Sequence, residues 1–382
     1  MEIEKESLER KDVRGVVREL IDEVTKTEDE AKEKSTRGGK SPDLKLYVVD
    51  ATEDVLGRLD EISASIIESE SSKSAAKEFF NKHLIEESQL NPGIWWVEIK
   101  TPRYERTDDF VFVEKDDAIW ILTTELKDWA EDTVEKVIKY LPQMERVYLS
   151  SNDLEDVMGS IIDSEVSGFT AKYRSQHRER DATLRFHGAE PNDMKKAEKH
   201  FQATPTRIEF NQRNSPSTAI QGSGSNDGIL TVESVRLGSE GKATDTLLGT
   251  SEDFTSKDNK RYNVNTDSSV KFFETGFSVD EFTSIELNNP ERETADCLDE
   301  EIESEILSKN QYQYGRWGND TFFIHDRHHD EIFELGIETP DLVLHAREST
   351  TALSLRSFCK KILDEFDSTY SIRKKETEVA LQ

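Results

Sequence analysis

A short stretch near the end of the chain concentrates side chains that could bind a metal ion. Four of the eight histidines lie between positions 325 and 345, and aspartates stand among them. Imidazole and carboxylate groups are common ligands of transition metals. The candidate ligands are His325, Asp326, His328, His329 and His345. Their spacing matches no HExxH motif, and a solvated turn between two strands accounts for the same residues equally well.

A second stretch, from Lys172 to Arg213, carries the charge that a phosphate backbone would attract. It holds ten lysines and arginines against six acids, whereas the rest of the chain holds 40 bases and 74 acids. Basic side chains on a sheet and a neighbouring helix can follow a nucleic-acid backbone, and nearby aromatic rings can stack on bases. The predicted phosphate contacts are Lys172, Arg174, Arg178, Arg180, Arg185, Lys195, Lys196 and Lys199. The alternative is that these bases pair with acids inside the protein.

Several other chemistries are not indicated. The sequence contains neither GxSxG nor GxxxxGK[ST], so it predicts no serine nucleophile of that kind and no phosphate-binding loop. Its two cysteines, Cys297 and Cys359, form no CxxC pair, and they predict neither a disulfide framework nor a zinc knuckle. No cofactor is expected, apart from a divalent metal if the histidine cluster binds one.

The elements that would position these residues predict an α+β fold of two domains behind an N-terminal helix. Apolar residues at helical spacing from Val13 to Val24 predict an amphipathic helix, and a polar linker follows it up to residue 42. The apolar stripe could dock on a protein partner or on the protein's own body. The first α+β domain spans 43–212. Two successive segments in it have the order strand–strand–helix–strand, which suggests tandem β-β-α-β units from an internal repeat.

The second half begins after a segment with no periodicity. Residues 213–228 are rich in Ser, Gly and Asn and predict a linker. A second α+β domain is expected over 229–372, although residues 239–268 are polar and poorly patterned. Its last element is an amphipathic helix from Leu355 to Phe366, with capping hydroxyls before it. Residues 373–382 are expected to form a charged tail.

The composition is strongly acidic. The 382 residues include 80 acids and 50 bases, for a net charge of -30. Such an excess of carboxylates is typical of an archaeal, halophilic cytoplasm, where salt screens their repulsion, although lysine outnumbers arginine 28 to 22. The charged N-terminus and the lack of a long apolar run predict a cytoplasmic protein with no membrane contact.

Together these features predict a non-enzymatic nucleic-acid-binding or regulatory protein that uses the basic stretch. One alternative is a metal-dependent hydrolase or nuclease that uses the histidine cluster. Another is a structural or assembly protein whose contacts are the N-terminal stripe and the last helix.

Overall fold

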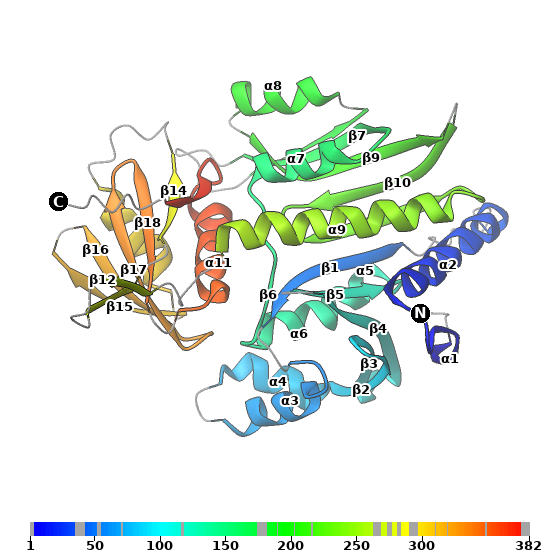
Figure 1. Ribbon diagram of the computed structural model, residues 1–382, viewed down its shortest axis with the longest axis horizontal. Helices are drawn as coiled ribbons and strands as arrows, with labels where there is room; N and C mark the ends of the chain where they lie inside the picture. Colours follow the sequence, from blue (N-terminus) through cyan, green and yellow to red (C-terminus); the bar gives the residue numbers. More distant parts are fainter. Residues whose placement is uncertain are drawn as a thin grey trace.

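Two antiparallel sheets and the helices around them build the protein, whose fold is of the predicted α+β class (Figure 1). The computed structural model describes residues 4–34, 43–51, 55–69, 72–115, 118–173, 182–188, 190–201, 203–214, 217–262, 269–272, 277–280, 284–289, 297–309, 311–318, 320–347 and 350–375. No helix in these ranges has both the length and the hydropathy that a membrane span requires.

The larger sheet has eleven described strands, and neighbouring strands in it are antiparallel. In spatial order they are β2 (Leu84–Asn91), β3 (Ile94–Thr101), β4 (Arg106–Lys115), β5 (Ala118–Thr123), β1 (Leu44–Ala51), β11 (Ile229–Val235), β10 (Ser217–Ser225), β9 (Ala203–Asn214), β7 (Ser164–Tyr173) and β8 (Ala182–His187), with β6 (Met144–Arg146) paired to β1. A short 3₁₀ turn, Pro102–Tyr104, connects β3 to β4.

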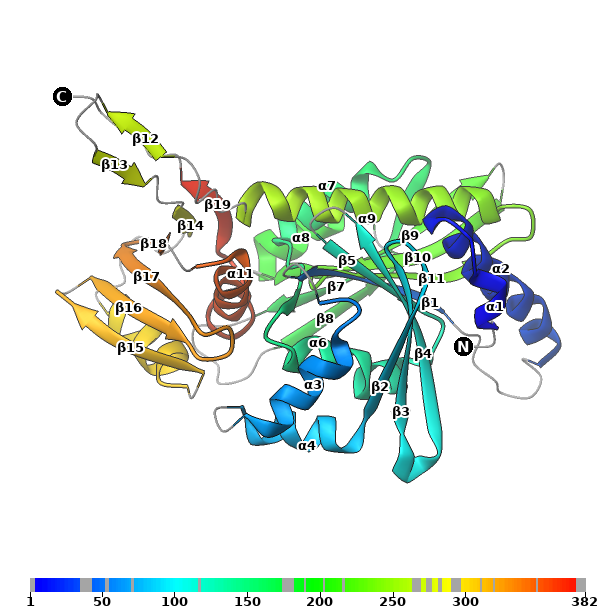
Figure 2. The same cartoon turned by 60° about the horizontal axis from the view of Figure 1, so that its bottom comes forward.

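Helices cover both faces of this sheet because its central strand is apolar on both sides. Leu46 and Val48 face one core, whereas Tyr47 and Val49 face the other, as alternation along a strand requires. The first core is closed by α1 (Lys5–Leu8), α2 (Val13–Lys34), α7 (Ser151–Ser160), α8 (Pro191–Phe201) and α9 (Glu240–Tyr262). The second is closed by α3 (Leu59–Glu68), α4 (Ser74–Lys82), α5 (Lys127–Asp132) and α6 (Val134–Tyr140) (Figure 2).

The N-terminal stripe docks on the protein's own body. Val16, Leu20 and Val24 are fully buried in the first core, and α2 packs against α9 and β11. The stripe is therefore not available to a protein partner in this structure, and the same holds for the last helix, whose apolar side is buried in the core of the smaller sheet.

The predicted linker at 213–228 is wrong. Residues 217–225 form β10, which pairs with β9 and β11 inside the larger sheet. Its glycines lie where neighbouring elements come close: a Cβ on Gly224 would collide with the sulfur of Met158 on α7, and a Cβ on Gly222 would collide with the carbonyl oxygen of Thr231 on β11. The segment 229–235, expected to open the second domain, is strand β11 of the same sheet.

A long helix, α9, occupies most of the segment that is poorly patterned in the sequence. Its buried side includes Thr244, Ser251 and Thr255, whose hydroxyls donate to the backbone carbonyls four residues earlier. Polar residues can be buried in this way because the helix itself satisfies them. These polar residues interrupt the apolar stripe of Ala243, Leu247 and Phe254 on the inward face of α9, which weakens the pattern by which a helix is recognised.

The smaller sheet follows α9 in the sequence. Its described strands, in spatial order, are β15 (Tyr312–Trp317), β16 (Thr321–Asp326), β17 (Glu331–Glu338), β18 (Asp341–Ala346), β14 (Ser284–Asn288) and β19 (Ser371–Lys375). A separate pair is formed by β12 (Ser269–Phe272) and β13 (Phe277–Asp280). Helices α10 (Leu298–Ile302) and α11 (Ala352–Lys361) continue as π-helical turns, Glu303–Leu307 and Ile362–Phe366, and pack on the sheet. Because β19 runs to Lys375, the predicted tail begins later than 373.

Both segments that suggested a repeat contain strand, strand, helix and strand in that order, but their third strands pair differently. β6 pairs with β1, whereas β9 pairs with β7 and β10. The internal repeat stays a prediction.

Candidate functional site

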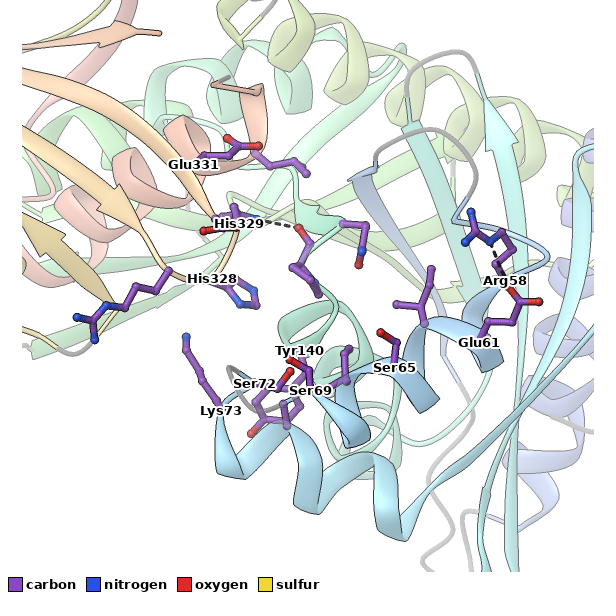
Figure 3. Close-up of a pocket in the computed structure, with 18 of the residues that line it drawn as sticks. Arg58, Glu61, Ser65, Ser69, Ser72, Lys73, Tyr140, His328, His329 and Glu331 are labelled. Carbon is purple, nitrogen blue, oxygen red and sulfur yellow. Dashed lines mark hydrogen bonds and ion pairs between the residues drawn. The ribbon is translucent and has the colours of Figure 1, made fainter. Parts of the chain in front are cut away.

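A groove of about 910 Å³ lies where the smaller sheet meets the helices of the larger one (Figure 3). One wall is α3 and the start of α4, the other is the turn between β16 and β17, and the floor is the segment after α6. The volume falls in the upper part of the range typical of small-molecule sites. We call this the inter-sheet groove. It is lined by Arg58, Glu61, Ile62, Ser65, Ile66, Ser69, Ser72, Lys73, Ala76, Tyr140, Pro142, Gln143, His325, Arg327, His328, His329, Asp330, Glu331 and Leu353.

The histidine cluster forms the hairpin wall of the inter-sheet groove. The predicted turn is present, since β16 ends at Asp326 and β17 begins at Glu331. Asp326 is fully buried and accepts a hydrogen bond of 2.9 Å from the backbone N–H of His328. Burial raises the pKa of this carboxyl. At the outer edge, His325 Nε2 lies 2.8 Å from the Asp330 carboxylate.

His329 fixes the hairpin against the larger sheet. Its side chain is 1% exposed, and Nδ1 lies 2.9 Å from the carbonyl oxygen of Pro142, so Nδ1 carries the proton and donates. Nε2 has no hydrogen-bond partner among the described residues. It lies 3.9 Å from Asp326 Oδ2 and 4.0 Å from Glu145 Oε2, which is too far for a direct hydrogen bond. A buried imidazole nitrogen without a partner is uncommon and costs free energy.

His328 is uncharged at neutral pH. Burial, followed by repulsion from His329 and Lys73, lowers the pKa of its imidazole to about 3. The centre of the His328 ring lies 4.7 Å from the centre of the His329 ring. Within the described ranges, neither of its ring nitrogens has a hydrogen-bond partner.

The helical wall was not anticipated from the sequence. Ser65, Ser69 and Ser72 line the inter-sheet groove, and Lys73 stands at its end, at the start of α4. Small polar residues are ordinary on the outer face of an amphipathic helix. No signal in the sequence separates these serines from any other solvated face, because the opposite wall comes from a segment about 250 positions away.

The predicted metal site is not assembled. His345 lies apart from the turn, on β18, where its Nδ1 is 2.8 Å from the Ser284 hydroxyl and burial lowers its pKa. Among the described residues, no three His, Cys, Asp or Glu side chains are arranged to hold one metal ion. The metal-dependent hydrolase predicted as an alternative therefore lacks a ligand set in this part of the chain.

The basic side chains of the stretch from Lys172 to Arg213 do not form one continuous patch among the described residues. Lys172 pairs with Asp364 at 3.0 Å and Lys196 with Asp193 at 2.8 Å. Arg174, Arg178 and Arg180 lie outside the described residues. Of the predicted phosphate contacts, three are exposed and make no ion pair with a described residue: Arg185, Lys195 and Lys199.

The three exposed bases do not share a face. Leu184 and Phe186 of β8 pack against the first core, so Arg185 between them points to the opposite side of the sheet. Helix α8 covers the first core, and Lys195 and Lys199 lie on its outer side. A single phosphate backbone cannot follow both faces at once.

A buried ion-pair cluster, which the sequence does not predict, joins the two sheets. Arg356 of α11 is 1% exposed and forms ion pairs with Asp258 of α9 and Asp50 of β1. Its guanidinium lies 4.8 Å from the centre of the Tyr262 ring, and the two carboxylates raise its pKa. This buried cluster holds the smaller sheet beside the inter-sheet groove.

The chain matches no protein-family model, and no curated protein sequence is significantly similar to it.

Proposed function

We propose that this protein is a binding protein whose small polar ligand occupies the inter-sheet groove. The observation that carries the proposal is the composition of the walls: one cavity of about 910 Å³ is lined by three histidines, three serines and charged side chains from both walls. Concave sites with a few convergent polar groups at the meeting of two structural units are the usual location of small ligands. A ligand there would bridge the two sheets.

The histidines support binding more than catalysis. His328 is uncharged, and His329 is held by the Pro142 carbonyl behind the surface of the inter-sheet groove. Among the lining carboxylates, Glu331 is the one placed most like a general base. It accepts hydrogen bonds from Thr351 N–H at 2.8 Å and from the Ser354 hydroxyl at 2.6 Å. It is committed to the start of α11.

Blocking the inter-sheet groove tests this proposal. Ser65→Trp places a large ring in it, whereas Ala64→Trp, on the same helix, places the ring in solvent outside the lining. Both variants and the unmodified protein are screened against nucleotides, sugar phosphates and carboxylic acids by the rise in Tm on binding. We expect at least one compound to raise Tm in the unmodified protein and in Ala64→Trp, but not in Ser65→Trp. A rise that Ser65→Trp leaves intact would contradict the proposal.

Binding of nucleic acid remains a second proposal, and the exposure of Arg185, Lys195 and Lys199 favours it, because these cations are not neutralised within the described residues. Since they lie on two faces, charge reversal tells the faces apart. Lys195→Glu with Lys199→Glu should weaken binding and flatten its salt dependence if α8 makes the contact, and Arg185→Glu should do so if the sheet does. Unchanged binding in both variants would end this proposal.

A further inference from the structure

The end of the inter-sheet groove at Lys73 brings two nitrogen donors together. Lys73 is exposed there, and it makes no hydrogen bond or ion pair with any described residue. Figure 3 shows its side chain rising from the start of α4 toward His328 on the hairpin wall. The imidazole of His328 likewise has no hydrogen-bond partner in the described part of the chain.

The carboxylates that line the inter-sheet groove are all engaged elsewhere. Glu61 pairs with Arg58 at 3.3 Å, and Asp330 lies 2.8 Å from His325. The third, Glu331, accepts hydrogen bonds from the first turn of α11. None of these three pairs with Lys73, and the carboxylate that acts on its ammonium group is the buried Asp326, which forms no ion pair with it among the described residues.

The interactions between these groups are those of an anion site without its anion. Desolvation lowers the pKa of Lys73 although the Asp326 carboxylate acts in the opposite direction, and burial together with the charges of His329 and Lys73 lowers the pKa of His328. A negative charge between the two groups would favour the charged form of each.

We infer that Lys73 and His328 bind the phosphate group of a phosphorylated small molecule, with the rest of the ligand lying along the serines that line the helical wall. This inference rests on the proposed function and specifies its ligand class. A phosphate fits because its several oxygens accept from an ammonium, an imidazole N–H and serine hydroxyls at the same time. The net charge of -30 repels phosphates at long range, so recognition depends on these local donors.

Binding measurements with AMP, adenosine and inorganic phosphate test the inference. We expect AMP and inorganic phosphate to bind, and adenosine to bind far more weakly than AMP. Lys73→Gln or His328→Gln should weaken AMP binding by about 10-fold to 100-fold, as for the loss of a hydrogen bond to a charged group. The matched control is Lys77→Gln, one turn along α4 and outside the lining, which should leave the affinity within about twofold.

A second readout does not depend on affinity alone. In an NMR titration, phosphate should raise the pKa of the His328 imidazole, because the anion stabilises its charged form. Equal effects of Lys73→Gln and Lys77→Gln, or an unchanged His328 titration in the presence of phosphate, would overturn the inference. If an uncharged compound binds and only Ser65→Trp abolishes it, the inter-sheet groove is the ligand site but the phosphate assignment is wrong.

Discussion

His328 and His329 are neighbours in one turn, yet their surroundings give them different tasks. His329 uses Nδ1 to hold the hairpin to Pro142, whereas His328 faces the inter-sheet groove. The sequence predicted that this cluster lies in a turn and could bind something, and the turn is confirmed. The partners of the cluster could not be predicted, because Lys73 and Pro142 come from distant segments and no motif links them to the histidines.

The altered titration of His328 predicts how stability depends on pH. Its folded-state pKa is lowered from 6.5 to about 3, so the unfolded chain takes up the proton first as pH falls. The free energy of unfolding therefore rises with pH across that window. We predict that His328→Gln reduces the rise between pH 5 and pH 7 by about 2 kcal/mol, measured by urea unfolding.

The exposed His187 on β8 provides the control. His187→Gln should keep the pH dependence of the unmodified protein. A His328→Gln variant with the same slope as His187→Gln would show that the imidazole of His328 protonates equally well in the folded chain.

At the scale of elements, the sequence predicted strands and apolar helices well and polar-faced elements poorly. Strand β1 and helix α11 follow from their apolar runs and stripes. The sequence predicts a linker at β10 because of its glycines, of which Gly224 makes room for α7, and it does not predict α9 because threonines and serines share the buried side of that helix with its apolar residues. In both cases a tertiary contact decides the structure, and the local pattern does not record it.

The start of α11 depends on a residue from another strand. Glu331 of β17 accepts hydrogen bonds from Thr351 N–H and Oγ1 and from the Ser354 hydroxyl, at 2.8, 2.7 and 2.6 Å. We predict that Glu331→Ala lowers the free energy of unfolding by about 2–4 kcal/mol, because several buried donors lose their acceptor. The control is Glu338→Ala at the exposed end of β17, where loss of the ion pair with Lys375 should cost less than about 1 kcal/mol. Equal losses in chemical denaturation would contradict the capping role.

At the scale of the whole molecule, the groove exists only because the two sheets are held at a fixed position. Arg356 contributes to this by pairing with carboxylates of α9 and β1. We predict that Arg356→Met costs about 3–5 kcal/mol of stability, because two carboxylates are left without their partner at a buried site. Arg14→Met, at an ion pair in which both side chains are more than half exposed, should cost far less. Similar losses for the two variants would mean that the buried cluster does not hold the sheets.

The charge of the proposed site differs from the strong acidity of the whole protein. The lining combines three cationic side chains with three carboxylates, so it is locally neutral on a protein of net charge -30. A phosphorylated ligand would therefore meet favourable donors only at short range. The predicted halophilic origin stays a prediction from composition.

The central claim, that one ligand bridges the two walls of the inter-sheet groove, is tested most directly by hydrogen–deuterium exchange with and without AMP. The account predicts slower exchange on binding at both walls, over residues 58–77 and 325–332, with no change along β8 and α8. Protection confined to one wall, or located at β8 and α8, would contradict it.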